Sequence, residues 1–357
     1  MSSVPYLLVF LCGAPLLVQA FDDIEEPMRA FLLLGTPLVF CMNFLLEWGY
    51  RGFVVDGQVT RLPLALAQFG GYLMIIGALF APSQASGRGY WLLIRLAAIL
   101  LGTLLIIKTG ARGQFISATL CAVVMFGLGR ANFSLVKLAL SGLVGCLLVA
   151  TAYMGAITYM KSEPSLQGTA ARWSVDRLFE DYGERSIRVL RIEAMLEAWA
   201  DNPGTMLVGL GNSASYDPNI TDCTSPIGCY PHNLPIEILT EQGIIGLVIF
   251  ASLLLYIGIA AIRAINDPTI DPDRKPALKA LLALLVFEAI LSLKQGSLLG
   301  NWALCLFAIL LDRAIDLLRR PVTLLDEQDE DNLLKSRTKE WLTRRQSNGG
   351  LGRRTAL

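Results

Sequence analysis

The sequence is poor in charge and nearly lacks histidine. Asp, Glu, Lys and Arg make up 17% of the 357 residues, whereas a soluble domain carries about 25%. Hydrophobic residues reach 54%, and the mean hydropathy is +0.53. A water-soluble globular fold is therefore excluded for most of the chain. The composition instead predicts helices packed in lipid.

Cysteine patterns that mark metal or redox sites are also missing. There is no CxxC pair and no cluster with metal-ligand spacing. Five of the seven cysteines lie in apolar runs, where they act most simply as small hydrophobic residues: Cys12, Cys41, Cys121, Cys146 and Cys305. Cys223 and Cys229 lie in a polar stretch, and they form either a disulfide, if that stretch faces an oxidising compartment, or two free thiols.

Long apolar runs dominate what is present. Because lipid leaves backbone groups no partner but each other, these runs are expected to be helices. The fold class predicted is an all-α membrane protein, a polytopic bundle of about nine or more transmembrane helices. The runs are 4–20, 28–47, 62–80, 90–107, 114–129, 134–155, 236–262, 278–294 and 300–318.

Lysine and arginine suggest the orientation of the bundle. They gather in the tail after the last run and in two short connections, which we assign to the cytoplasmic side. Four regions follow from this topology. Residues 1–155 hold the N-terminal helices, 156–235 form a large outer loop, 236–320 hold the C-terminal helices, and 321–357 form a polar cytoplasmic tail.

The first run, 4–20, has two interpretations. It resembles the apolar part of a signal peptide, with a small-residue cleavage site at Val18-Gln19-Ala20. However, no Lys or Arg precedes it, so it is also read as a transmembrane span. The number of N-terminal spans stays open.

A short basic turn follows the run 90–107 and carries Lys108 and Arg112. The topology puts this turn on the outer side, where cations are disfavoured. Both side chains could snorkel to lipid headgroups. Alternatively, they form an anion site in which Arg112 binds phosphate through its planar fork and Lys108 adds a point charge. A tight turn is expected to explain Gly110 and Gly113.

The segment 183–200 is expected to form an amphipathic helix that stops before Pro203. Its apolar stripe would pack on the bundle or lie in the membrane interface. Arg185, Arg188 and Arg191 recur at every third position and form a basic row beside that stripe. The row is either a solvated face paired with neighbouring glutamates or a second clamp on a polyanionic headgroup.

His232 is the only histidine, and it lies just before an apolar run. Pro235 suits the first turn of a helix, so His232 and Asn233 are expected near a helix N-terminus. A lone histidine most simply makes a structural hydrogen bond. The alternative is a general base, because its ordinary pKa lies close to neutral pH.

Together these groups suggest a transfer reaction at the membrane surface. Arginine side chains would hold a diphosphate leaving group, and His232 would deprotonate a sugar hydroxyl. That hydroxyl would attack the anomeric carbon and expel the lipid diphosphate. Arginine can perform the electrostatic task without a metal, and the outer loop has no DxD-type carboxylate cluster. We therefore expect neither a metal nor another cofactor.

The order of motifs carries a family resemblance, which covers roughly residues 90–318. An arginine, an amphipathic helix, a proline, a Gly-x-Gly, a His-Asn pair and a Glu-x-Gly-x-x-Gly stretch follow one another. They are Arg188, the helix to residue 200, Pro203, Gly209-Leu210-Gly211, His232-Asn233 and Glu241-Gln242-Gly243-Ile244-Ile245-Gly246. This order resembles the O-antigen ligase/polymerase superfamily of bacterial inner-membrane glycosyltransferases. The turn around Arg112 resembles a further short motif of that family.

The resemblance implies a multi-pass bundle in the bacterial inner membrane, with a large periplasmic loop and an active site that faces the periplasm. It implies a metal-independent glycosyltransferase that uses an undecaprenyl-diphosphate-linked glycan as donor. Lipid A-core, another lipid-linked glycan or a protein hydroxyl would be the acceptor. Membrane lipids are the expected surroundings, and no nucleic acid is expected as a partner.

The resemblance implies a functional role for only some of the candidate site residues. Arg112, Arg188 and His232 match functional positions of the family, whereas Arg185 and Arg191 are added from the helical row. Ligase and polymerase activity stay open.

Two functions of other classes also stay open. A flippase or transporter of lipid-linked sugars would use ionisable residues within the membrane, for which Glu288 and Lys294 are the candidates. A non-catalytic partner in a polysaccharide assembly complex would use the polar loop as an interaction surface, and His232 would then be replaceable.

Overall fold

The computed structural model describes residues 23–49, 54–55, 58–59, 64–82, 88–109, 111–128, 187–221, 232–294 and 301–319, together with positions 155, 158 and 162. The chain divides into two compact units, residues 1–315 and 316–357. All elements discussed below belong to the first unit, apart from the last residues of the final helix.

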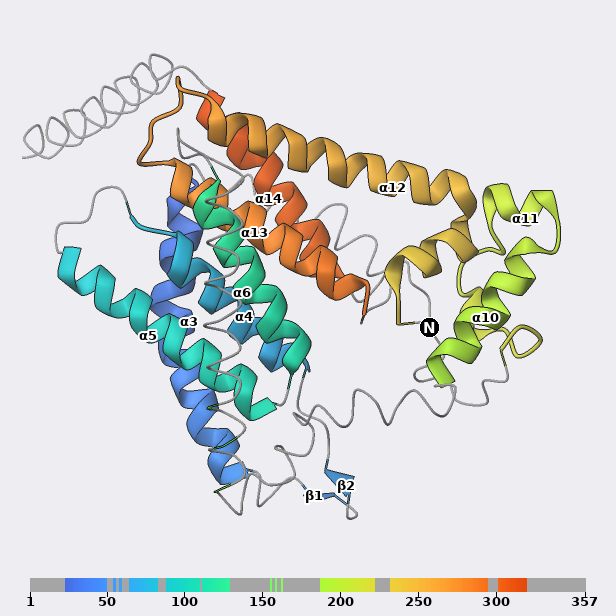
Figure 1. The fold of residues 1–357 in the computed structure, drawn as a ribbon, viewed down its shortest axis with the longest axis horizontal. Coiled ribbons are helices and arrows are strands. Elements are labelled where there is room, and N and C mark those ends of the chain that lie inside the picture. Colours follow the sequence, from blue (N-terminus) through green and yellow to red (C-terminus); the bar gives the residue numbers. More distant parts are fainter. Residues whose placement is uncertain are drawn as a thin grey trace, which may run out of the picture. The chain divides into compact units, whose positions relative to one another are not determined.

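Helices make up nearly all of the described structure, as expected (Figure 1). They are α3 (Glu25–Gly49), α4 (Leu64–Leu79), α5 (Arg88–Thr109), α6 (Arg112–Gly127), α10 (Ile187–Ala200), α11 (Pro203–Val208), α12 (Leu234–Asn266), α13 (Lys275–Ser292) and α14 (Trp302–Arg319). A 3-10 turn, η3, spans Ala214–Tyr216. Two short strands, β1 (Val54–Val55) and β2 (Gln58–Val59), pair in antiparallel fashion with Val54 opposite Val59.

Every predicted apolar run that falls within the described residues forms a helix, with ends shifted by a few residues. Run 4–20 and all but the last residue of run 134–155 lie outside them. Among the described helices, three are long and apolar enough to cross a membrane: Glu25–Phe44, Gly89–Ile107 and Leu234–Asn266. The chain is thus a helical membrane protein, while the count of nine spans stays an expectation.

Helix α4 packs against α3, α5, α6 and α13, and its middle is buried. Glycines let α4 approach α5 closely, because a Cβ on Gly70 would meet the carbonyl oxygen of Gly102 at 2.8 Å. Small residues serve the same purpose at many helix contacts in membranes. Arg95 of α5 donates to the carbonyl oxygens of Gly77 and Ala78 at 2.8 and 3.0 Å, so its charge meets the C-terminal end of α4.

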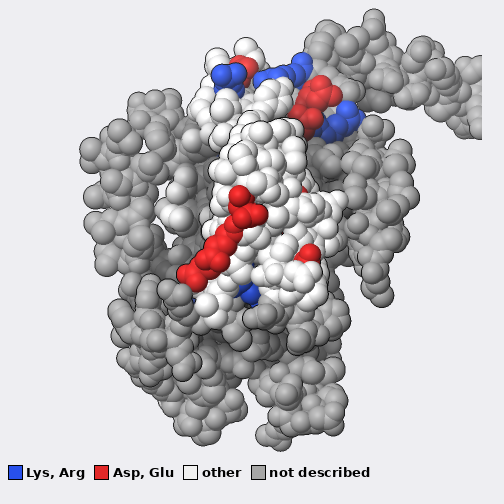
Figure 2. All heavy atoms as spheres, turned by 90° about the vertical axis from the view of Figure 1, so that its right-hand side faces the viewer, with Lys and Arg blue, Asp and Glu red and all other residues white. Residues whose placement is uncertain are grey.

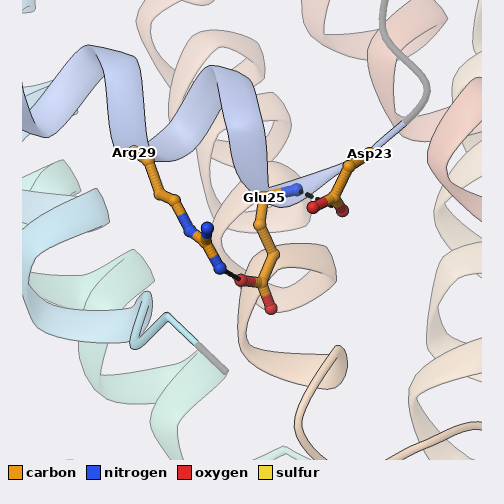
Figure 3. A network of polar contacts seen from close by, with 3 residues as sticks. All are labelled: Asp23, Glu25 and Arg29. Atoms are coloured by element: carbon orange, nitrogen blue, oxygen red, sulfur yellow. Dashed lines mark hydrogen bonds and ion pairs between the residues drawn. The ribbon is translucent and has the colours of Figure 1, made fainter. Parts of the chain in front are cut away.

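Polar side chains fix the start of α3 and its contact with α5. The Asp23 carboxylate accepts a hydrogen bond from the Glu25 backbone N–H at 3.0 Å, and Arg29 donates to the Glu25 carboxylate one turn along (Figure 3). Further along, the Asn43 amide donates to the carbonyl oxygens of Val39 and Leu101 at 3.0 and 3.2 Å.

Helix α12 is broken at Gly243, where φ is 72° and ψ is −174° (Figure 1). Only glycine adopts this backbone conformation readily. The break separates a short first segment, which begins at Leu234, from a long apolar second segment. Other parts of the chain make hydrogen bonds both to the start of α12 and to the residues before its break.

Candidate functional site

Asn233 joins the start of α12 to the end of α13. As the residue that caps α12, it accepts a hydrogen bond through Oδ1 from the backbone N–H of Ile236 at 3.1 Å. Its Nδ2 donates to the carbonyl oxygen of Leu293 at 3.0 Å. Pro235 lies in the first turn of α12, as the sequence predicts. One side chain therefore satisfies groups at two helix ends.

Lys294 joins the end of α13 to the start of α6. Its Nζ lies 3.3 Å from the place that a Cβ on Gly113 would occupy. Gly113 was expected to serve a tight turn, but this expectation is wrong, because Gly113 lies inside α6. Its missing side chain instead leaves room for the Lys294 headgroup. Gly110 lies outside the described residues.

These contacts bring Arg112 and His232 to the same group of helix ends. Arg112 is the first residue of α6, next to Gly113, and His232 directly precedes Asn233. Both side chains are half-buried and have contacts within the protein. The helix ends that meet here are those that the predicted topology put on one side of the membrane. That this side is the periplasm stays a prediction.

His232 has a strained backbone, with φ at 56°. Non-glycine residues seldom occupy this left-handed region, and the cost is of order 1 kcal/mol, although histidine tolerates it better than most. The neighbouring Asn233 is held on both sides, by the Ile236 N–H and by the Leu293 carbonyl oxygen. Such strain is commonly stored at functional sites, so it supports a functional role for His232.

The start of α6 favours an anion. Ala111 precedes the helix and has no side chain that could accept from its first N–H groups. The N-terminal end of a helix carries partial positive charge, and Arg112 adds a full charge beside it. Such a combination attracts anions in general.

The Gly-x-Gly motif docks onto the break in α12. Leu210 N–H donates to the Thr240 carbonyl oxygen at 2.8 Å, and Gly211 N–H donates to the Glu241 carbonyl oxygen at 3.0 Å. In an unbroken helix these carbonyls would accept from residues four positions on. The break at Gly243 makes them available to the loop, so the motif does more than form a turn.

The Gly-x-Gly motif and the Glu-x-Gly-x-x-Gly motif both need glycine, because the backbone of the loop touches the backbone of α12 at the break. Gly209 has φ at 86°, and a Cβ on it would clash with the carbonyl group of Glu241. A Cβ on Gly243 would clash with the carbonyl group of Leu207. A Cβ on Gly246 would lie 2.5 Å from the Gln242 Cβ. We call this contact between residues 207–211 and 240–243 the glycine clasp.

Glu241 anchors the segment after the clasp. Its side chain is buried, and Oε1 accepts from the Ser215 hydroxyl at 3.3 Å and from the Ser215 N–H at 3.5 Å. Thr221 in turn donates through its hydroxyl to the Ser215 carbonyl oxygen at 3.0 Å. The family-type glutamate therefore supports η3 on α12.

Helix α10 ends at Ala200, before Pro203, as predicted. Pro203 begins a new helix, α11, which is capped by the Asn202 side chain accepting from Thr205 N–H at 2.9 Å. Trp199 closes the corner by donating from Nε1 to the Met206 carbonyl oxygen at 3.2 Å. Through this corner α10 packs against α11, α12 and η3.

The other predicted anion ligands are described only in part. Arg191 lies on α10, is half-buried and has contacts within the protein. The backbones of Arg188 and Lys108 lie in α10 and α5, but their side chains are outside the description. Arg185 and both cysteines of the predicted pair, Cys223 and Cys229, lie outside the described residues altogether. Their roles stay predictions.

An acidic row on α10 was missed in the sequence. Glu193, Glu197 and Asp201 are four positions apart, so they share one side of the helix and its end. Figure 2, seen from the side on which α10 and α11 lie, shows acidic side chains in a row on an otherwise mostly uncharged face. The regular spacing was the signal that could have revealed it.

Glu288 and Lys294, the candidates for transport within the membrane, lie in different surroundings. Glu288 is fully buried in α13, and its Oε1 accepts from the Tyr72 hydroxyl at 2.6 Å and from Gln68 Nε2 at 2.7 Å. It therefore ties α13 to α4. Lys294 follows the end of α13 and is exposed.

Within the described ranges, no three His, Cys, Asp or Glu side chains come together in a way that could hold a metal ion.

The sequence matches none of the curated proteins. The model of the O-antigen ligase family matches residues 96–251, from within α5 to within α12. The match contains Arg112, Arg188, His232 and both glycine motifs. This match supports membership of the O-antigen ligase/polymerase superfamily.

Proposed function

We propose that the protein is an inner-membrane glycosyltransferase that moves a glycan from an undecaprenyl-diphosphate donor to a hydroxyl acceptor at the periplasmic face. The observation that supports this most is the meeting of three helix ends, which brings His232 and Arg112 into one neighbourhood. The family match supports glycan transfer as the reaction class.

The reaction is a single displacement. An oxygen of the acceptor hydroxyl attacks the anomeric carbon of the donor glycan, and the bond from that carbon to the diphosphate oxygen breaks. A ring nitrogen of His232 takes the hydroxyl proton. The electron pair of the broken bond leaves with the lipid diphosphate, whose charge Arg112 and the α10 arginines offset. The acceptor can be lipid A-core or another glycan, which corresponds to ligase or polymerase activity.

The experiment replaces His232 or Arg112 by alanine in the native host and measures surface glycan and lipid-linked precursor together. A general base contributes about 10²–10⁴-fold to a rate, so His232→Ala should nearly abolish surface glycan while precursor accumulates outside. Arg263→Ala is the matched control, because Arg263 is an exposed arginine in the last turn of α12, at the other end from His232. Membrane insertion is checked by protein level.

Other outcomes would remove the proposal. Normal surface glycan from a stably inserted His232→Ala variant would exclude catalysis by His232 and favour a non-catalytic partner. Precursor trapped on the cytoplasmic side would favour a flippase. Against the flippase stands the glycine clasp, in which loop N–H groups already occupy the carbonyls exposed by the helix break.

A further inference from the structure

Lys294 carries a charge that the described structure does not balance. Its side chain is exposed, and among the described residues its Nζ has no hydrogen-bond or ion-pair partner. Glu288, the only acidic residue of α13, is buried and bound by Tyr72 and Gln68. Within the part of the chain that the structure describes, Lys294 therefore serves no structural ion pair.

The position of this charge is unfavourable unless an anion is present. Lys294 Nζ lies against the first turn of α6, close to Gly113, which directly follows Arg112 in the sequence. A cation near a helix N-terminus is repelled by the helix dipole. An exposed lysine could extend into solvent, yet here it lies over Gly113. A bound anion would turn this repulsion into attraction.

We propose that Lys294 binds the diphosphate of the lipid-linked donor, together with Arg112. The inference rests on the proposed function and adds a residue to it. The two side chains approach from different helix ends, Lys294 from α13 and Arg112 from α6. Lysine offers a mobile point charge and arginine a planar fork, so the pair suits a group with two phosphates.

Gly113 has a defined part in this arrangement. Among the described residues, only atoms of Lys294 lie within 4 Å of a Cβ placed at position 113. A larger side chain there would displace the Lys294 headgroup. Gly113→Leu therefore moves the charge while leaving Lys294 itself in place.

The experiment measures binding of undecaprenyl diphosphate and undecaprenyl monophosphate to the purified full-length chain in lipid nanodiscs. We compare the wild type with Lys294→Gln, Lys294→Arg and Gly113→Leu. Lys279→Gln is the matched control, since it removes a lysine near the opposite end of the same helix. Thermal unfolding of each variant shows whether it is folded.

We expect Lys294→Gln and Gly113→Leu to weaken diphosphate binding about tenfold, the usual effect of losing one charge-assisted hydrogen bond. Lys294→Arg should restore most of the affinity, and Lys279→Gln should bind like the wild type. Monophosphate should bind more weakly and respond less to Lys294→Gln.

Two results would overturn the inference in different ways. If the wild type binds the diphosphate and Lys294→Gln binds it equally well, Lys294 has no part in the site, while the proposed function stands. If the folded wild type does not bind the diphosphate, the donor assigned under the proposed function fails, and the role of Lys294 fails with it.

Discussion

At the scale of single residues, Asn233 has two separable tasks. Its Oδ1 caps α12, and its Nδ2 holds Leu293 at the end of α13. Asn233 directly follows His232, whose backbone φ is 56°, so its contacts hold the chain next to the histidine. A residue that sequence reasoning treats as the companion of the histidine is thus the one that positions it.

Asn233→Asp should separate these tasks. Aspartate caps a helix as well as asparagine does, but it cannot donate to Leu293. We expect Asn233→Asp to lower glycan transfer strongly with a loss of about 1 kcal/mol in stability, the usual worth of one hydrogen bond. Asn233→Ala should cost about 1 kcal/mol more, because it also removes the cap.

Thermal unfolding of the purified variants and surface glycan in the host measure the two effects. Asn202→Ala is a control that removes a helix cap away from His232, on α11. Full glycan transfer by Asn233→Asp would show that the contact with Leu293 does not matter for activity.

At the scale of elements, the glycine clasp holds α11 and its loop on the break in α12. Gly209, Gly211 and Gly243 all have positive φ, but their surroundings differ. Backbone atoms of the other segment crowd Gly209 and Gly243. By contrast, no atom of the described residues lies within 4 Å of a Cβ on Gly211.

Alanine at these positions should therefore have unequal effects. Gly211→Ala should cost about 1–2 kcal/mol from backbone strain alone. Gly209→Ala and Gly243→Ala should cost clearly more, because a clash is added to the strain. Thermal unfolding measures the order. Equal stability of the three variants would mean that the membrane-embedded protein does not form the glycine clasp.

The contact between α4 and α13 offers a second test at this scale. Glu288→Ala would leave the buried Tyr72 hydroxyl without its acceptor, at a cost of about 1–3 kcal/mol, whereas the half-buried Gln68 amide would keep its hydrogen bond to the Tyr72 hydroxyl oxygen at 2.9 Å. Glu288→Gln keeps one acceptor oxygen and should be tolerated much better. Unfolding in detergent gives the stability of each variant.

Glycan transfer should survive in Glu288→Gln, because the side chain has a structural role in this account. A complete loss of surface glycan with normal stability would instead indicate that an ionisable group is needed there. That outcome would favour a transporter.

At the scale of the whole molecule, the sequence predicts the helices well because lipid demands long apolar runs with internal hydrogen bonds. Local signals such as Pro203 and Pro235 also predict where α10 ends and α12 begins. The break at Gly243 lies inside the run 236–262, which hydropathy predicts as one span, and the polar residues Thr240, Glu241 and Gln242 directly before it are a weak local sign of it.

The site is harder to predict than the helices. Asn233 and Leu293 are sixty positions apart, and no local pattern marks their contact. From the sequence alone, Lys294 is an ionisable residue at the end of an apolar run. In the structure, its Nζ lies over Gly113 at the start of α6. Contacts of this kind depend on how helices pack, which is set by the whole bundle.

The central claim is that His232 removes the proton of the acceptor at a site that holds a lipid diphosphate. The most direct measurement follows the release of undecaprenyl diphosphate from a glycan-loaded donor by the purified full-length chain in lipid, with and without acceptor. His232→Ala should bind the donor like the wild type but release diphosphate about 100-fold more slowly or worse. Release at the wild-type rate by a folded His232→Ala variant would contradict the account.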